Sequence, residues 1–179
     1  MAQTNSKIIR IALIGPESTA KSTLSEQLAR HYMTHWVKEY SREYLSKISR
    51  KYTLDDILLI AQKQLEQENK LLQTANKFIF ADTELILSKV WCEDVFNICP
   101  DWINENILPH KYDLYLLTYP DLPWEKDAVR ENGNRRQFFY DWYEKELKAI
   151  NANYQVIKGG NEERLNNCIS AIENFSAHI

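Results

Sequence analysis

The sequence predicts an α/β fold in which helices sandwich a five-stranded parallel sheet. Apolar, strand-like runs alternate with helix-like patterns along the whole chain, and this alternation is typical of parallel strands joined by helical crossovers. The first run leads into a loop, GPESTAKST at residues 15–23, that opens the first helical pattern. Parallel sheets bind ligands at the carboxyl ends of their strands, so we expect the functional site at that edge.

The expected strands are short apolar runs, the first of which has the composition of a strand buried on both faces. They span residues 8–14, 35–38, 77–81, 112–118 and 154–158. Apolar residues at helical spacing predict helices that begin at 21 and 53, a third that runs through 91, one around 139–150 and a closing one around 165–172. Thr53 and Asp56 form a capping signal for the longest of these. The charged and aromatic segment 39–45 is expected to be a connecting loop.

The loop at residues 15–23 matches the phosphate-binding pattern G-x-x-x-x-G-K-[ST] with one departure, because Ala20 stands where the second glycine is expected. In this pattern backbone N–H groups wrap the phosphates, Lys21 reaches the β- and γ-phosphates, and the Ser22 hydroxyl joins a Mg²⁺ shell. The alternative, an ordinary strand-to-helix turn, leaves Gly15 and Lys21 unexplained. The sequence therefore predicts a P-loop NTPase fold that binds nucleotide phosphates.

Composition narrows the classes of ligand. The chain has 179 residues, 44% of them hydrophobic, which suits one compact domain over residues 1–179. A formal net charge of −3 gives no basic field, so nucleic acid is not an expected partner. No apolar stretch approaches the ~20 residues of a membrane span, so no membrane is expected either. The cysteines Cys92, Cys99 and Cys168 show no metal-binding spacing and are expected to be reduced thiols in the cytoplasm.

Carboxylates follow two of the expected strands. Asp82 stands at the end of the third strand, where it would hold Mg²⁺ or act as a base opposite a P-loop, the alternative being the N-cap of the next helix. Glu84 is a weaker second carboxylate. Glu39 follows the second strand, where it would accept a hydroxyl proton from an acceptor, the alternative being a solvated charge beside Lys38. Arg42, close to Glu39 in the sequence, is a further candidate, the alternative being a surface ion pair of little energy.

The polar segment 121–137 is expected to be a mobile lid. Pro123 and Gly133 bracket its arginines like hinges, and such lids bring positive charge onto a transferring phosphoryl group and exclude water. The arginines are Arg130, Arg135 and Arg136, of which we favour Arg130 for this role. The alternative is a basic surface helix.

Aromatic residues outside the helical stripes are candidates to stack on a flat ring. Trp124, Tyr40 and Tyr44 are such residues, and Trp would be the preferred partner of a cationic ring. The alternative for Trp124 is packing within the lid. Arg164, after the Gly159–Gly160 pair, is expected to pack on adenine.

Five features of the chain together resemble, in order and spacing, the ribosylnicotinamide kinase domain of NadR-type proteins. They are GPESTAKSTL, EYSREYL, FIFADTELILSKVW, YDLYLLTYPDLPWEKDAVRENGNRR and the late glycine followed by Arg164. The resemblance implies a P-loop kinase that transfers the γ-phosphate of ATP to the 5′-hydroxyl of nicotinamide riboside, giving nicotinamide mononucleotide. It covers nearly the whole chain.

The resemblance also implies roles for matching residues. Those expected to hold ATP and Mg²⁺ are Gly15, Glu17, Ser18, Thr19, Ala20, Lys21, Ser22 and Thr23. Those expected around the riboside are Glu39, Tyr40, Arg42, Asp82 and Trp124, with Arg130 and Arg135 as lid residues. Either Glu39 or Asp82 would be the base.

Two departures from the family pattern matter. The Ala20 methyl would crowd the β-phosphate, which would affect the rate of phosphoryl transfer. The H-x-G-H motif of the adenylyltransferase domain is absent, so a separate partner would supply nicotinamide mononucleotide adenylyltransferase activity. The other readings are a kinase for a different nucleoside or nucleotide, and a slow nucleotide-dependent switch.

Overall fold

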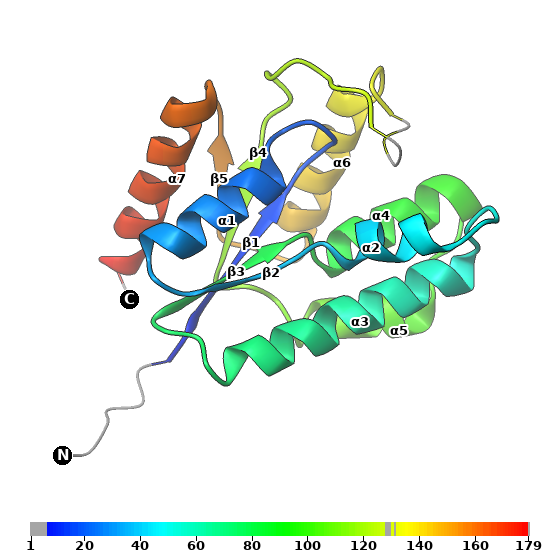
Figure 1. Ribbon diagram of the computed structural model, residues 1–179, viewed down its shortest axis with the longest axis horizontal. Helices are drawn as coiled ribbons and strands as arrows, with labels where there is room; N and C mark the ends of the chain where they lie inside the picture. Colours follow the sequence, from blue (N-terminus) through cyan, green and yellow to red (C-terminus); the bar gives the residue numbers. More distant parts are fainter. Residues whose placement is uncertain (1–6, 128–129, 131, 179) are drawn as a thin grey trace.

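A computed structural model describes residues 7–127, 130 and 132–178. Within these ranges the strands form one parallel sheet in the order β2-β3-β1-β4-β5 (Figure 1). The strands are β1 Ile9–Ile14, β2 His35–Val37, β3 Phe78–Asp82, β4 Leu114–Thr118 and β5 Tyr154–Ile157. This order confirms the predicted five-stranded parallel sheet and places β1, with the loop that follows it, at the centre.

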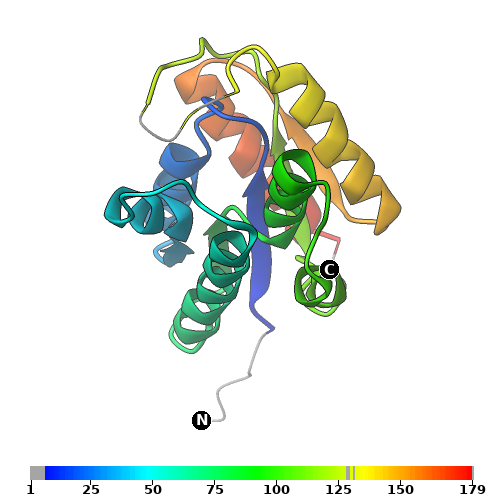
Figure 2. The ribbon, with the colours of Figure 1, turned by 90° about the vertical axis from the view of Figure 1, so that its right-hand side faces the viewer.

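Helices cover both faces of the sheet. They are α1 Lys21–His31, α2 Tyr40–Lys47, α3 Leu54–Leu72, α4 Leu85–Phe96, α5 Asp101–Ile107, α6 Arg136–Ala149 and α7 Asn161–Ser176. In Figure 1, α1 and α7 lie side by side against one face. Helices α3, α4 and α6 pack against the opposite face, and Figure 2 shows them from another direction. The longest helix, α3, begins with the expected capping box between Thr53 and Asp56.

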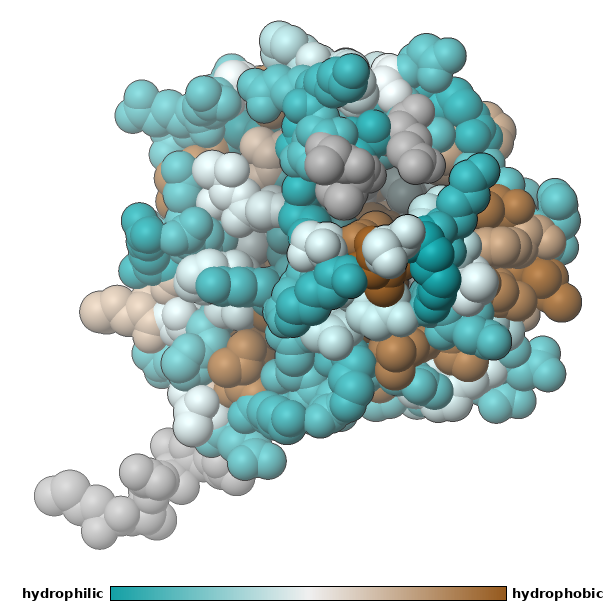
Figure 3. Space-filling view, turned by 45° about the vertical axis from the view of Figure 1, so that its right-hand side comes forward, coloured by the Kyte–Doolittle hydropathy of each residue, from teal (hydrophilic) through white to brown (hydrophobic). Residues whose placement is uncertain are grey.

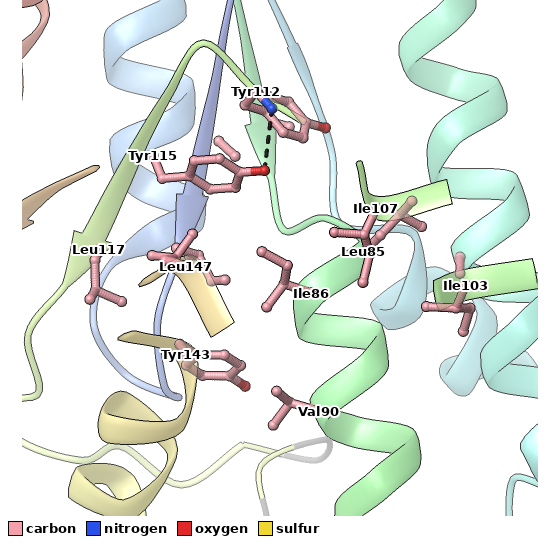
Figure 4. Close-up of a cluster of buried hydrophobic side chains, with 14 of the residues drawn as sticks. Leu85, Ile86, Val90, Ile103, Ile107, Tyr112, Tyr115, Leu117, Tyr143 and Leu147 are labelled. Atoms are coloured by element: carbon pink, nitrogen blue, oxygen red, sulfur yellow. Dashed lines mark hydrogen bonds between the residues drawn. The ribbon is translucent and has the colours of Figure 1, made fainter. Parts of the chain in front are cut away.

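The core has two halves because successive side chains of a strand point to opposite faces. Ile11 and Leu13 of β1 pack with α1 and α7, whereas Ala12 and Ile14 face the helices on the other side. Figure 4 shows part of that second half, where side chains of α4 and α6 meet β4. There the backbone N–H of Tyr112 donates a 3.2 Å hydrogen bond to the Tyr115 hydroxyl. The loop that follows β1, at residues 15–20, is therefore anchored by apolar strands that are buried on both faces.

Two helices differ from the expectation. Segment 39–45 was expected to be a loop, but Glu39 is the N-cap of α2 and the rest of the segment belongs to that helix, so Tyr40 and Tyr44 stand on a helix. None of the α2 residues is fully buried, and for this reason the helix has no continuous apolar stripe for the sequence to reveal. Helix α5 was not predicted, because its seven residues are too few to show a clear period.

Hydrophilic residues dominate the molecular face in Figure 3, and hydrophobic ones gather there only in small groups. Among the residues that the structure describes, no helix combines the length and the apolar character needed to cross a membrane.

Candidate active site

Three neighbouring strands carry the candidate site at their carboxyl ends. The P-loop joins β1 to α1, Asp82 ends β3, and Glu39 lies two residues after the end of β2. Leu13 of β1 pairs with Asp82, and Val37 of β2 pairs with Ala81. The parallel register thus brings the P-loop and both predicted carboxylates to the same edge of the sheet.

Lys21 lies within the electrostatic reach of both carboxylates. Its Nζ donates a 2.8 Å hydrogen bond to the Pro16 carbonyl. Burial lowers the pKa of Lys21, while the charges of Glu39 and Asp82 act in the opposite direction. A lysine near two carboxylates is a strong local charge that an incoming phosphate can pair with.

Asp82 is 2% exposed, and burial is the main reason why its pKa is raised to about 6. The neighbouring Glu39 charge adds to this increase, and a hydrogen bond with Ser22 opposes it. One carboxylate oxygen, Oδ1, has no hydrogen-bond partner among the described residues. A buried, unpartnered carboxylate oxygen beside a hydroxyl fits a Mg²⁺ ion, which keeps several waters and needs few protein ligands. The described residues contain no cluster of three or more His, Cys, Asp or Glu suited to a metal.

The P-loop backbone is unusual at three positions. Gly15 has φ +149°, and a Cβ there would lie 2.2 Å from Thr118 Oγ1, so only glycine fits. Ser18 and Ala20 both adopt the left-handed region, with φ 54° and 66°. Thr19 is locked between them, because its Oγ1 donates to the Pro16 carbonyl at 2.8 Å and lies 2.6 Å from Thr118 Oγ1. Ala20 therefore occupies a conformation that glycine adopts without strain.

Replacing Ala20 by glycine is expected to stabilise the protein by about 0.5–1 kcal/mol, because relief of ~1–2 kcal/mol of left-handed strain exceeds the entropy cost of the new glycine. Urea unfolding measures this difference. The matched control is Ala29→Gly in the middle of α1, where the same change should destabilise by about 1 kcal/mol. Equal destabilisation by both changes would show that Ala20 carries no strain.

Glu39 is held in place by two residues of α2. Its two carboxylate oxygens accept hydrogen bonds from Ser41 Oγ at 2.7 Å and from Arg42 Nε at 2.9 Å. Arg42 also pairs with Asp127 of the lid segment at 2.8 Å. Arg42 is thus more than a surface ion pair, since it joins the carboxylate after β2 to the lid. Nothing in the sequence singled out Asp127.

The tyrosines of α2 do not share one role. Tyr44 donates a 2.6 Å hydrogen bond to Asp56 Oδ1 at the start of α3, so this hydroxyl serves the fold. The Tyr40 ring lies 6.2 Å from the Tyr44 ring, and the Tyr40 backbone N–H donates to Gln64. Tyr40 is half-buried on the helix that begins directly after Glu39.

Described residues of the lid segment rest on the P-loop. Trp124 Nε1 and the Asn132 backbone N–H donate to the same Glu17 oxygen, at 3.2 and 3.1 Å. The Trp124 ring covers Gly133 so closely that a Cβ would lie 2.8 Å from it. The Glu17 side chain therefore points toward the lid segment. Trp124 packs on Gly133 within that segment, which is the alternative to ring stacking that the sequence left open for it. Three residues of the expected lid, 128, 129 and 131, lie outside the described residues.

The lid arginines have separate partners. Arg130 Nη1 donates to the Glu125 carbonyl at 2.8 Å, and its buried Nε has no hydrogen-bond partner among the described residues. Arg135 Nη1 donates to Asp94 of α4 at 3.0 Å. Arg136 donates to the Leu122 carbonyl. Arg130 Nε lies 3.9 Å from Asp127 Oδ2, so each of the three arginines has a partner among the described residues.

Arg164 differs from the expectation that it packs on adenine. Its side chain is fully buried, and it donates to the backbone carbonyls of Thr19 and Tyr119 at 3.2 Å and to the Asp121 carboxylate. A guanidinium enclosed in this way has no free face for a ring. Sequence reasoning missed these bonds because backbone carbonyls from distant segments leave no pattern of residue types.

Glu84, and not Asp82, is the N-cap of α4. Its carboxylate accepts from the backbone N–H groups of Ile86 at 2.9 Å and Leu87 at 3.2 Å. The N-cap alternative for Asp82 is therefore wrong, because β3 ends at Asp82 itself, one residue later than expected, and the helix begins only after Glu84. Burial raises the pKa of Glu84 to about 7. Glu84 is thus a structural cap with an unfavourable buried charge at neutral pH.

The Glu84→Gln variant is expected to be more stable than the unmodified chain by about 1–3 kcal/mol at pH 8, and by much less at pH 5. The raised pKa means that the stabilisation from the protonated carboxyl is complete below about 4.5 and is lost as the pH rises through about 7. Gln keeps an acceptor oxygen and does not titrate. Urea unfolding at both pH values tests this, with exposed Glu105→Gln as the control, and an unchanged pH dependence would contradict the buried charge.

Comparisons with known proteins place the chain in a family. The model of the AAA_28 family, described as an AAA domain, matches residues 10–164. The trifunctional NAD biosynthesis/regulator protein NadR of Salmonella typhimurium is 25% identical over 172 residues, which cover 91% of this chain and 42% of NadR. The protein of the same name from Escherichia coli is 28% identical over 137 residues, covering 72% of this chain and 33% of NadR. The chain thus spans less than half of these relatives.

Solved structures show the same fold. A crystal structure of NadR in complex with NR superposes with a TM-score of 0.72 at 20% identity, covering 95% of this chain and 50% of that one. A second, with NAD and AMP-PNP, has the same values. The match over residues 10–164, which include the P-loop and both carboxylates, shows that the chain belongs to the AAA_28 family.

Proposed function

We propose that this chain is an ATP-dependent kinase that transfers the γ-phosphate of ATP to the 5′-hydroxyl of nicotinamide riboside, giving nicotinamide mononucleotide. The observation that carries the proposal is the placement of Glu39 and Asp82 opposite Lys21, at the ends of neighbouring strands. A phosphate loop facing two carboxylates provides a donor side and an acceptor side. The resemblance to NadR supports the riboside as the acceptor.

The donor side binds and orients ATP. The N-terminus of α1 presents backbone N–H groups to the phosphates, and Lys21 pairs with the β- and γ-phosphates. Ser22 and Asp82 would hold Mg²⁺, which neutralises phosphate charge when it is bound. Positive charge on the transferring group is the main requirement of this reaction, because the protein has little covalent chemistry to supply.

The acceptor side holds a proton acceptor. Glu39 is oriented by Ser41 and Arg42, and we assign it to receive the proton of the acceptor hydroxyl. Glu39 follows the outer strand β2, whereas Asp82 ends β3 beside the P-loop, where Ser22 acts to lower its pKa. Arg42 positions Glu39 and links it to Asp127 of the lid.

The lid encloses the reacting groups. Trp124 and Glu125 rest on the side chains of Glu17 and Ser18, which joins the lid to the P-loop. Arg130 would bring its guanidinium to the transferred phosphoryl group. Carboxylates near the acceptor also favour a positively charged nicotinamide ring, and tyrosine or tryptophan rings can stack on it.

A panel of nucleosides tests the acceptor directly. The purified chain is incubated with ATP, Mg²⁺ and each nucleoside, and ADP release is followed with a coupled assay. We expect turnover with nicotinamide riboside to exceed that with adenosine, cytidine, thymidine and uridine. Turnover with one of those and none with nicotinamide riboside would assign a different acceptor to the same kinase.

A second function, a slow nucleotide-dependent switch, is favoured by one observation, the strained Ala20 in the P-loop. If the alanine slows catalysis, Ala20→Gly raises turnover greatly while ATP affinity stays constant. If turnover is unchanged, the alanine is tolerated and the kinase proposal stands.

The kinase product would pass to a separate nicotinamide mononucleotide adenylyltransferase. NAD formation only after that enzyme is added to the assay would support this partner.

A further inference from the structure

Arg164 is a buried cation that gathers segments from different parts of the chain. It comes from the first turn of α7, and its side chain is fully buried. Its nitrogen atoms donate to the carbonyls of Gly159 at 3.0 Å, Thr19 at 3.2 Å and Tyr119 at 3.2 Å, and it pairs with Asp121. The bond to Thr19 is the one that reaches the P-loop.

The direction of that bond sets the orientation of one peptide group. In a planar trans peptide the C=O and the N–H point in opposite directions. Because the Thr19 carbonyl points into the interior toward Arg164, the N–H of Ala20 points outward. This N–H stands at the N-cap of α1, where the helix terminus presents its N–H groups to an anion.

The same peptide carries the strain of Ala20. Rotation of the Thr19–Ala20 peptide would move φ of Ala20 out of the left-handed region, where it now lies at 66°, into a region that alanine prefers. The rotation would also turn the N–H away from the phosphates. Alanine thus favours the rotated, non-binding state, and the bond from Arg164 opposes it.

We propose that Arg164 is a positioning residue that holds the Thr19–Ala20 peptide in its phosphate-binding orientation, against the preference of Ala20. The proposal rests on the proposed nucleotide site but not on the identity of the acceptor. Lysine cannot replace arginine here, because a single ammonium cannot reach Thr19, Tyr119 and Asp121 in a fixed fork.

A double-mutant cycle on ATP affinity tests the proposal. We expect Arg164→Lys to weaken binding of Mg²⁺–ATP about tenfold, or about 1.4 kcal/mol, because the rotated peptide becomes populated. Ala20→Gly alone should change the affinity less than about twofold, and it should restore most of the loss in the double variant, because glycine has no preference for the rotated state. A fluorescent ATP analogue, displaced by ATP, measures all four proteins without need of turnover.

A second guanidinium provides the control. Arg10 is also largely buried, and it pairs with Glu68 at 2.7 Å near the start of β1, away from the P-loop. Arg10→Lys should lower the melting temperature without changing ATP affinity. If Arg164→Lys is insoluble, Asp121→Asn takes its place in the cycle. This variant removes the carboxylate beside the guanidinium and should weaken ATP binding about threefold.

The outcomes separate the two proposals. Equal ATP affinity of Arg164→Lys and the unmodified chain, or a loss that Ala20→Gly does not reduce, would overturn the positioning role. ATP binding without transfer to any nucleoside would overturn the kinase proposal. The double-mutant cycle on ATP affinity would still test the positioning role of Arg164. Absence of ATP binding by the unmodified chain would contradict both.

Discussion

Replacing Lys21 by alanine is expected to lower kcat for phosphoryl transfer by about 10²–10³-fold. Lys21 opens α1 and feels the charges of Glu39 and Asp82, so a phosphate there meets the only side chain of residues 15–23 that carries a positive charge. Backbone N–H groups of the loop remain in the variant and keep part of the ATP affinity. The loss should therefore be larger in kcat than in ATP binding.

Steady-state kinetics at saturating ATP and riboside, together with an equilibrium ATP-binding measurement, separate these two effects. Lys38→Ala is the matched control, because Lys38 is an exposed lysine next to Glu39 and should leave both quantities unchanged. A Lys21→Ala protein with an undiminished rate would contradict the P-loop assignment, whatever the acceptor is.

The P-loop and the parallel strands of the sheet were predictable because local signals carry them. Gly15 and Lys21 belong to a short motif whose spacing follows from phosphate geometry, and apolar runs such as residues 8–14 mark buried parallel strands. Once the sheet is parallel, carboxylates that follow its strands must share one edge, so Glu39 and Asp82 were expected near each other. The structure places them there.

Features that depend on tertiary contacts were not predictable. Helix α2 packs as a half-exposed surface element and buries no residue fully, so its sequence shows no apolar stripe. Arg164 was expected to pack on adenine, yet most of its partners are backbone carbonyls that no residue pattern reports. The pairing of Arg135 with Asp94 joins the N-cap of α6 to α4 across 41 residues of sequence, which no local pattern reports.

The two carboxylates should be separable by their dependence on metal. Glu39→Gln and Asp82→Asn are each expected to lower kcat by about 10²–10³-fold, because one loses the proton acceptor and the other a ligand of the phosphate-bound ion. Asp82→Asn should in addition raise the Mg²⁺ concentration for half-maximal activity about tenfold, since the unpartnered Oδ1 of Asp82 is the atom that fits the ion. Glu39→Gln should leave that concentration within about twofold.

Titrating activity with Mg²⁺ for both variants therefore decides between the roles that the sequence left open. Glu43→Gln is the control, because Glu43 is an exposed carboxylate of α2 that pairs with Lys47 and should affect neither quantity. If the metal requirement shifts in Glu39→Gln and not in Asp82→Asn, the two assignments are exchanged. If neither variant loses more than about tenfold in kcat, well below the usual effect of removing a catalytic group, the acceptor does not bind between these strands. The distinction follows from the geometry, because Asp82 ends β3 beside the P-loop and Ser22, whereas Glu39 faces the same loop from the end of the outer strand β2.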